Sequence, residues 1–243
     1  MSIDAKSGLK AAGIWTLVEF AIRVGLIAVA GGGLALSGNL PEGSALPGTF
    51  VGMALAVPLA IAAVVLTAIF WRRATREGLG PRDLGYHISR HRVLAGVASG
   101  LFLHLLLGWG TARIDLALFP DAAKAAELLM RLIASGGPVV LASMLLANGI
   151  LGPIVEEFAW RGYVQYRLTR AWGTWAGLAV TALLFAAKHM VVDLSFGRTL
   201  TLLVGACVLG LIRWRWGTAA STVAHVTLNL FGTWYVLATA AGS

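Results

Sequence analysis

The sequence has little of what a soluble or disulfide-bonded protein contains. Cys207 is the only cysteine, so no disulfide can form within the chain. Charged residues make up 12% of the 243 residues, whereas hydrophobic residues make up 58% and the mean hydropathy is +0.81. A soluble core does not absorb this much apolar sequence. The composition therefore excludes an ordinary soluble domain and indicates an integral membrane protein.

Long apolar stretches recur along the chain, many of them near the ~20 residues that an α-helix needs to cross a bilayer. We place them at residues 13–36, 48–71, 93–112, 138–160, 174–192, 199–213 and 218–240. The sequence thus predicts an all-α, polytopic membrane bundle of about seven transmembrane helices that form one membrane domain. The sixth stretch is short, which predicts tilt or a thinned bilayer. Residues 37–47 are expected to form a turn-rich exterior loop.

Basic residues outnumber acidic ones and give a net charge of +8. In a soluble protein this would suggest nucleic acid as a partner. Here a large share of the arginines falls between the second and third stretches, namely Arg72, Arg73, Arg76, Arg82, Arg90 and Arg92. The positive-inside rule places that loop in the cytoplasm, with the N-terminus inside and the C-terminus outside the inner (cytoplasmic) membrane. We therefore expect the lipid bilayer, and not nucleic acid, as the partner of these charges.

Polar side chains interrupt three of the stretches. They are Glu156, Glu157 and Arg161 in the fourth or just beyond its end, Lys188 and His189 in the fifth, and His225 and Asn229 in the seventh. A carboxylate at mid-membrane depth costs about 2.5–3.5 kcal/mol on insertion scales, so two adjacent ones need partners or a function. Residues four apart share a helix face, as His225 and Asn229 do. The three groups together form a candidate site.

Peptide hydrolysis is the chemistry that such a cluster supports. A carboxylate next to an imidazole, in a cavity shielded from bulk water, can act as a general base on a water molecule. Attack on a peptide carbonyl builds an oxyanion, which His225 and the Asn229 amide are spaced to stabilise as hydrogen-bond donors. Arg161 can hold Glu157 by a charge-assisted contact.

Other interpretations stay open. Glu156, His189 and His225 would make a His2Glu set, a known composition of catalytic zinc sites, although the helical HExxH spacing is absent. Alternatively, the glutamates and Arg161 form a buried ion pair in a non-catalytic membrane immunity or scaffold protein. A transporter is less favoured, since no pair of broken-helix repeats is evident. We favour a metal-free enzyme and expect no cofactor, with zinc as the minority alternative.

The first half of the chain is interpreted as scaffold. Glu19 and Arg23 are four residues apart and are predicted to form a structural pair. Residues 119–132 are predicted to form an amphipathic helix at the membrane interface. Ser221 lies four residues before His225 and is predicted to pack between helices. Lys188 receives no role.

The order EExxxR, FxxxH and HxxxN on separate apolar stretches resembles the CPBP family of intramembrane proteases, also called the CAAX protease or Abi family. The motifs lie at Glu156 to Arg161, Phe185 to His189 and His225 to Asn229, and the resemblance covers residues 138–231. It implies that residues 138–243 are the catalytic helices and residues 1–137 are N-terminal scaffold helices.

The resemblance also implies an activity, that of an intramembrane endopeptidase. Its substrates would be peptides or proteins at the membrane, of prenylated type in the eukaryotic branch, and no oligomeric state is indicated. By position, Glu156 would activate the water, Glu157 with Arg161 would support it, His189 would assist the base, and His225 with Asn229 would form the oxyanion site.

Overall fold

The computed structural model describes residues 2–36 and 48–241, and every regular element among them is a helix. In chain order these elements are α1 (Ile3–Leu36), α2 (Gly48–Arg76), α3 (Arg90–Leu106), α4 (Ala112–Leu118), α5 (Pro120–Ala134), α6 (Gly137–Met144), α7 (Gly152–Glu156), α8 (Tyr166–Trp172), α9 (Thr174–Val192), α10 (Thr199–Trp216) and α11 (Thr218–Ala241). Wider π-helical segments connect some of them, at Leu107–Thr111, Leu145–Leu151 and Glu157–Gln165. The loop expected at 37–47 lies outside the described residues.

The all-α membrane bundle predicted from the sequence is confirmed. Within the described ranges, six helical spans are long and apolar enough to cross a membrane, namely Asp4–Val29, Thr49–Arg76, Arg90–Leu118, Gly137–Trp172, Thr174–Val192 and Thr199–Trp216. The seventh apolar stretch is also helical and forms α11, 24 residues long. Helix α11 is not among those six, so the count of seven stays a prediction.

The fourth span continues well past residue 160, where the apolar stretch was expected to end. From Gly137 to Trp172 the chain stays helical through α6, α7, α8 and the two π-helical segments between them. Hydropathy could not show the continuation, because it is set by packing: Tyr163, Val164 and Leu168 are fully buried. π-helical turns occur frequently at functional sites, and the longest one here begins at Glu157.

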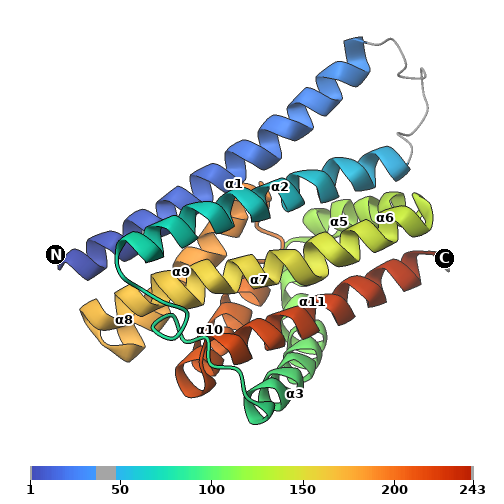
Figure 1. Cartoon of the computed structure of the whole chain (residues 1–243). Coiled ribbons are helices and arrows are strands. Elements are labelled where there is room, and N and C mark those ends of the chain that lie inside the picture. The colour runs from blue at the N-terminus through green and yellow to red at the C-terminus, as the bar shows by residue number, and fades with distance from the viewer. Residues whose placement is uncertain (1, 37–47, 242–243) are drawn as a thin grey trace.

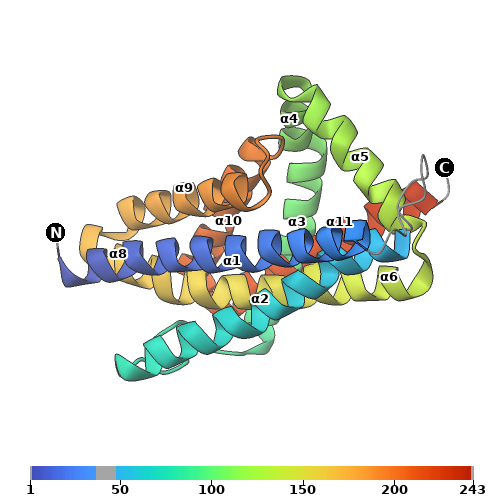
Figure 2. The ribbon, with the colours of Figure 1, turned by 90° about the horizontal axis from the view of Figure 1, so that it is seen from above.

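The helices form one bundle with the termini at opposite ends (Figure 1). Helices α1 and α2 lie beside each other and beside the long span that contains α7, and α11 runs along the other side of that span. Seen from above, α3 and α4 run across the direction of α1 and α2 (Figure 2). The middle of the long span, at α7 and the π-helical segment after it, therefore lies among helices from both halves of the chain.

An aromatic cluster joins the N-terminal helices to the long span. Trp15 of α1 contacts Phe70 of α2 with ring centroids 5.6 Å apart, and it contacts Trp160 at 6.3 Å. Trp160 in turn packs edge-on against Phe185 of α9 at 5.4 Å. Edge-to-face pairs at these distances add to the stabilisation from buried area. Helices α1, α2 and α9 are thus fixed around the segment that carries the two glutamates.

Close packing and a tight turn set the position of α11. A Cβ added at Gly100 of α3 would lie 2.5 Å from the backbone oxygen of Ala224, so glycine permits the approach of α3 to α11. Gly217 ends α10 with φ of 89°, a left-handed conformation that glycine adopts without strain. Thr218 then donates a 2.5 Å hydrogen bond to the backbone oxygen of Leu84. Together these contacts fix the helix that carries His225.

Candidate active site

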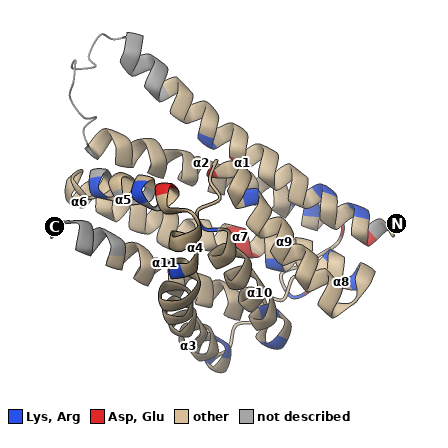
Figure 3. Ribbon diagram, turned by 180° about the vertical axis from the view of Figure 1, so that it is seen from behind, with Lys and Arg blue, Asp and Glu red and all other residues tan. Residues whose placement is uncertain are grey.

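The charged residues of the bundle have an uneven distribution. Figure 3 shows lysines and arginines mostly toward the end of the bundle that holds the N-terminus and α8, with a red acidic segment at α7 in the middle of the bundle. That segment is the Glu156–Glu157 pair. The two carboxylates are adjacent in sequence, and apart from His225 they contact different side chains.

Glu157 is completely buried and makes three polar contacts. The guanidinium Nη1 of Arg161 lies 3.3 Å from its Oε1, with both side chains 1% exposed or less. The hydroxyl of Ser221 donates a short hydrogen bond to its Oε2. The Nδ1 of His225 lies 3.0 Å from its Oε1. Because a carboxylate can only accept, Nδ1 of His225 carries a proton. Glu157 thereby fixes the orientation of the His225 ring.

Arg161 is held by further contacts in addition to that with Glu157. Its guanidinium carbon lies 4.3 Å from the centroid of the Phe185 ring, a cation–π contact. Its Nη2 donates to the backbone oxygen of Ala206, 3.3 Å away. Arg161 is therefore a fixed, buried cation.

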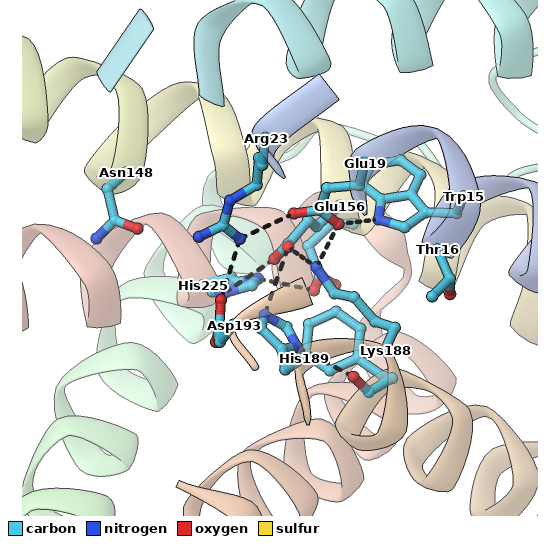
Figure 4. A network of polar contacts seen from close by, with 12 residues as sticks. Trp15, Thr16, Glu19, Arg23, Asn148, Glu156, Lys188, His189, Asp193 and His225 are labelled. Atoms are coloured by element: carbon cyan, nitrogen blue, oxygen red, sulfur yellow. Dashed lines mark hydrogen bonds and ion pairs between the residues drawn. The ribbon is translucent and has the colours of Figure 1, made fainter. Parts of the chain in front are cut away.

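Glu156 faces a different set of groups and keeps some exposure. Its side chain is 14% exposed, whereas that of Glu157 is fully buried. Its Oε1 lies 2.5 Å from Nζ of Lys188 and 3.7 Å from Nε2 of His189. Its Oε2 lies 3.9 Å from Nε2 of His225. Figure 4 shows these side chains pointing toward one another from α7, α9 and α11. The structure therefore brings together five of the six residues that were assigned catalytic roles from the sequence, all except Asn229.

The protonation of His189 follows from its backbone contact. Its Nδ1 lies 3.0 Å from the backbone oxygen of Phe185, one turn earlier in α9. A carbonyl oxygen can only accept a hydrogen bond, so Nδ1 carries the proton. In a neutral His189, Nε2 then presents a lone pair toward Glu156. The aromatic ring of Phe185, 4.7 Å from the imidazole, further restricts its rotation.

Asn229 lies one helical turn after His225, as predicted, but its amide is directed to a backbone group. Its Nδ2 donates to the backbone oxygen of Asn148, 3.0 Å away. The side chain of Asn148 donates in turn to Thr233 at 2.9 Å. Among the described contacts, Asn229 makes no hydrogen bond to either glutamate. An amide nitrogen has two hydrogens, so a second donor remains.

Three residues at the site were not assigned to it from the sequence. Ser221 was expected to pack between helices but bonds to Glu157, and its spacing of four from His225 was the signal. Lys188, left without a role, bonds to Glu156. Glu19 does contact Arg23 at 3.5 Å, as predicted, and it also bonds to Lys188 at 2.9 Å. Helix α1, interpreted as scaffold, thus reaches the candidate site.

The residues as arranged do not fit the zinc alternative. Within residues 2–36 and 48–241, no three His, Cys, Asp or Glu side chains are placed so that they could hold one metal ion. The ammonium group of Lys188 also occupies Oε1 of Glu156, the oxygen nearest to His189. A zinc site needs its nitrogen and oxygen ligands at about 2.0–2.2 Å from one centre, and a cation at that oxygen opposes a second cation there.

Comparisons with known proteins identify one matching region. Residues 138–231 match the family model described as type II CAAX prenyl endopeptidase Rce1-like. This is the region over which the sequence motifs were found. Neither the curated proteins nor the solved structures contain a match to the chain.

Proposed function

The chain belongs to the CAAX/CPBP family of membrane endopeptidases, and on that premise we propose that it hydrolyses peptide bonds with a water molecule activated by Glu156. The single observation that carries the proposal is the environment of Glu156. This carboxylate is partly exposed and faces two imidazoles, while the neighbouring carboxylate is buried and fully partnered.

The oxygen Oε2 of Glu156 is the proposed proton acceptor. Lys188 occupies Oε1, whereas the contact of Oε2 with His225 is 3.9 Å, too long for a hydrogen bond. A water bound at Oε2 donates one proton to that oxygen. The unprotonated Nε2 of His189 lies 3.7 Å from Oε1 of the same carboxylate, and in this proposal it accepts the other hydrogen of the water. A lone pair of the water oxygen is then left for the attack on the carbonyl carbon. Removal of the proton by a positioned base contributes on the order of 10²–10⁴ to the rate.

Attack on the carbonyl carbon forms a C–O bond and places a negative charge on the carbonyl oxygen. His225 supports this charge when it is doubly protonated, because its Nδ1 proton is committed to Glu157 and its Nε2 proton is then free to donate. The second hydrogen of the Asn229 amide is the further donor. When the C–N bond breaks, the proton held by Glu156 passes to the leaving amine, so Glu156 is regenerated as a carboxylate.

We propose that the N-terminus is cytoplasmic and that substrates enter from the cytoplasmic side. The end of the bundle that holds the N-terminus is rich in lysine and arginine, as cytoplasmic ends of membrane proteins are (Figure 3). A tryptophan pair, Trp175 and Trp214, lies near the ends of α9 and α10 with ring centroids 5.3 Å apart. Tryptophan is enriched at membrane–water interfaces.

An open apolar groove on the surface of the bundle favours substrates with an apolar part. It measures about 350 Å³ and lies between α2 and the long span, where its lining includes Thr67, Trp71, Leu151 and Val155. A prenyl group or an apolar peptide segment in this groove would contact the same span that carries the proposed base.

The test uses purified protein in liposomes and two quenched fluorescent peptides of the same sequence. One peptide carries a farnesyl group on its cysteine and the other does not. Each is incubated with the wild type and with Glu156→Gln, with and without a chelator, and the products are identified by mass spectrometry. We expect cleavage of the farnesylated peptide by the wild type only, equally fast with chelator.

Other results would change the proposal in defined ways. Loss of cleavage with chelator, restored by zinc, would replace the glutamate mechanism by the metal-dependent one. Equal cleavage of the two peptides would remove the preference for prenylated substrates. Equal cleavage by wild type and Glu156→Gln would remove Glu156 from the reaction.

A further inference from the structure

Lys188 is an unusual residue at the site because it is a lysine that is 1% exposed inside an apolar helix. Its ammonium group contacts two carboxylates from distant parts of the chain, Oε1 of Glu156 at 2.5 Å and Oε2 of Glu19 at 2.9 Å. It also lies 5.3 Å from the centroid of the Phe185 ring. A buried charge needs partners of this kind, so the position of Lys188 is fixed from both sides.

Glu19 is fixed in its turn by α1. The indole of Trp15, one turn earlier, donates a 2.6 Å hydrogen bond to Oε2 of Glu19. Arg23, one turn later, approaches Oε1 of Glu19 at 3.5 Å. Figure 4 shows Trp15 and Glu19 of α1 turned toward Lys188. A helix outside the family match thus supplies the second carboxylate for Lys188.

The same contacts continue to the end of α9. Arg23 reaches Oδ1 of Asp193 at 3.1 Å, and Arg198 reaches Oδ2 at 2.5 Å. Burial raises the pKa of Asp193, but the guanidinium groups of Arg198 and Arg23 outweigh it, and the pKa is lowered to about 2. Positive and negative groups alternate along the path Arg198, Asp193, Arg23, Glu19, Lys188 and Glu156. The neighbouring pair of Glu157 and Arg161 adds one group of each sign, so the two signs are equal in number. Such a balance offsets the cost of placing charges in the membrane.

The consequence for Glu156 concerns its two oxygens. With Lys188 on Oε1, rotation of the carboxylate is restricted and Oε2 is the oxygen turned toward His225. We propose that Lys188 and Glu19 are positioning residues, which hold the Glu156 carboxylate so that Oε2 is the oxygen that accepts the proton from water. Neither residue touches the substrate, and helix α1 becomes part of the assembled site. This inference rests on the proposed function of Glu156.

The alternative explanation is that Lys188 and Glu19 form a purely structural ion pair. Single and double substitutions distinguish this structural role from the positioning role. In Lys188→Met, Glu156 and Glu19 are left as buried carboxylates without their common cation, so both activity and thermal stability fall. In the double variant Glu19→Gln with Lys188→Met, one of these carboxylates is removed together with the cation. Replacing both members of a buried ion pair is often neutral for stability. Because Glu156 still lacks its cation, we expect the double variant to recover part of the thermal stability and none of the lost kcat.

The measurement is kcat and KM on the farnesylated peptide, together with the melting temperature of each variant. For the double variant we expect kcat to fall on the order of 10²-fold, the usual effect of a displaced catalytic group, with KM little changed. Lys188→Arg keeps the charge and is expected to recover a large part of kcat relative to Lys188→Met.

Asp4→Asn is the matched control. Asp4 is also on α1 and pairs with Arg167 of α8 at 2.6 Å, which ties α1 to the same half of the chain without touching Glu156. We expect Asp4→Asn to leave kcat unchanged. A loss of kcat in Asp4→Asn equal to that in the double variant would reduce the role of Glu19 to the docking of α1. Recovery of both kcat and melting temperature in the double variant would overturn the proposal.

Failure of the proposed function itself would show as an absence of cleavage by the wild type. If the wild type cleaves neither peptide, the catalytic role of Glu156 and the positioning role are both overturned. The contact itself is tested separately by melting temperatures of Lys188→Met, Glu156→Gln and their double variant. Additive losses would show that Lys188 does not pair with Glu156, whereas a double variant more stable than Lys188→Met alone supports the pairing.

Discussion

Replacement of Arg161 by methionine should strongly destabilise the protein. Arg161 is the cation for the fully buried carboxylate of Glu157, with 3.3 Å between Nη1 and Oε1. Methionine fills much of the same space against Phe185 but carries no charge. Glu157 would keep its contacts with Ser221 and His225 only.

The size of the effect follows from the burial of the pair. Removing one member of a buried ion pair costs about 3–5 kcal/mol, because the other charge stays buried without its partner. For a chain of 150–250 residues, each kcal/mol lost from the free energy of unfolding lowers the melting temperature by about 2–4 °C. The melting temperature of Arg161→Met should therefore fall by about 6–20 °C. The double variant Glu157→Gln with Arg161→Met carries no unpaired charge and should recover most of that loss.

The assay is thermal unfolding of the purified variants in one detergent, followed by intrinsic tryptophan fluorescence. The single variant Glu157→Gln is the matched control, since it leaves Arg161 buried without a carboxylate. A melting temperature of Arg161→Met within about 2 °C of the wild type would refute the reasoning. It would show that leaving Glu157 buried without its cation costs far less free energy of unfolding than expected.

Three further predictions concern the helix contacts and the donors of the site. Gly100→Ala should destabilise by about 1–3 kcal/mol in the same thermal assay, because the added methyl group lies 2.5 Å from the backbone oxygen of Ala224; an unchanged melting temperature would show that α3 and α11 can separate. Ser221→Ala should cost about 1.5–3 kcal/mol through the lost hydrogen bond to the Glu157 carboxylate, and Ser221→Thr should retain part of it. Asn229→Ala should lower kcat by on the order of 10²–10³ with little change in KM if its amide is an oxyanion donor, whereas an equal change in both constants would point to substrate binding.

Hydropathy was sufficient to locate the helices in the sequence, but it did not give their full lengths. The stretch 174–192 coincides with α9, since Gly173 and Asp193 bound an apolar run. The fourth span runs on to Trp172, although the sequence after Trp160 is polar in part. Some of its polar groups bond to atoms far along the chain, as Nε2 of Gln165 does to the backbone oxygen of Gly210. Such partners have no local signature in a sequence.

The candidate site likewise combines contacts that the sequence predicts with contacts that it does not predict. The contact of Glu157 with Arg161 was predictable because residues four apart share a helix face. The contacts of Lys188 with Glu156 and Glu19 join residues 32 and 169 positions apart, and no periodicity reports such pairs. The rule that intramembrane charges need partners did indicate that Lys188 had one. The rule could not indicate which carboxylates pair with Lys188, because Glu19 and Glu156 come from different halves of the chain.

The most direct test of the account is the turnover of Glu156→Gln on the farnesylated peptide under saturating conditions. Glutamine keeps the shape of the side chain and can still accept a hydrogen bond from Lys188, so the melting temperature serves as a check on folding. The account predicts that kcat falls by on the order of 10²–10⁴, the contribution of a general base, while KM changes little. A folded Glu156→Gln protein that retains wild-type turnover would contradict it.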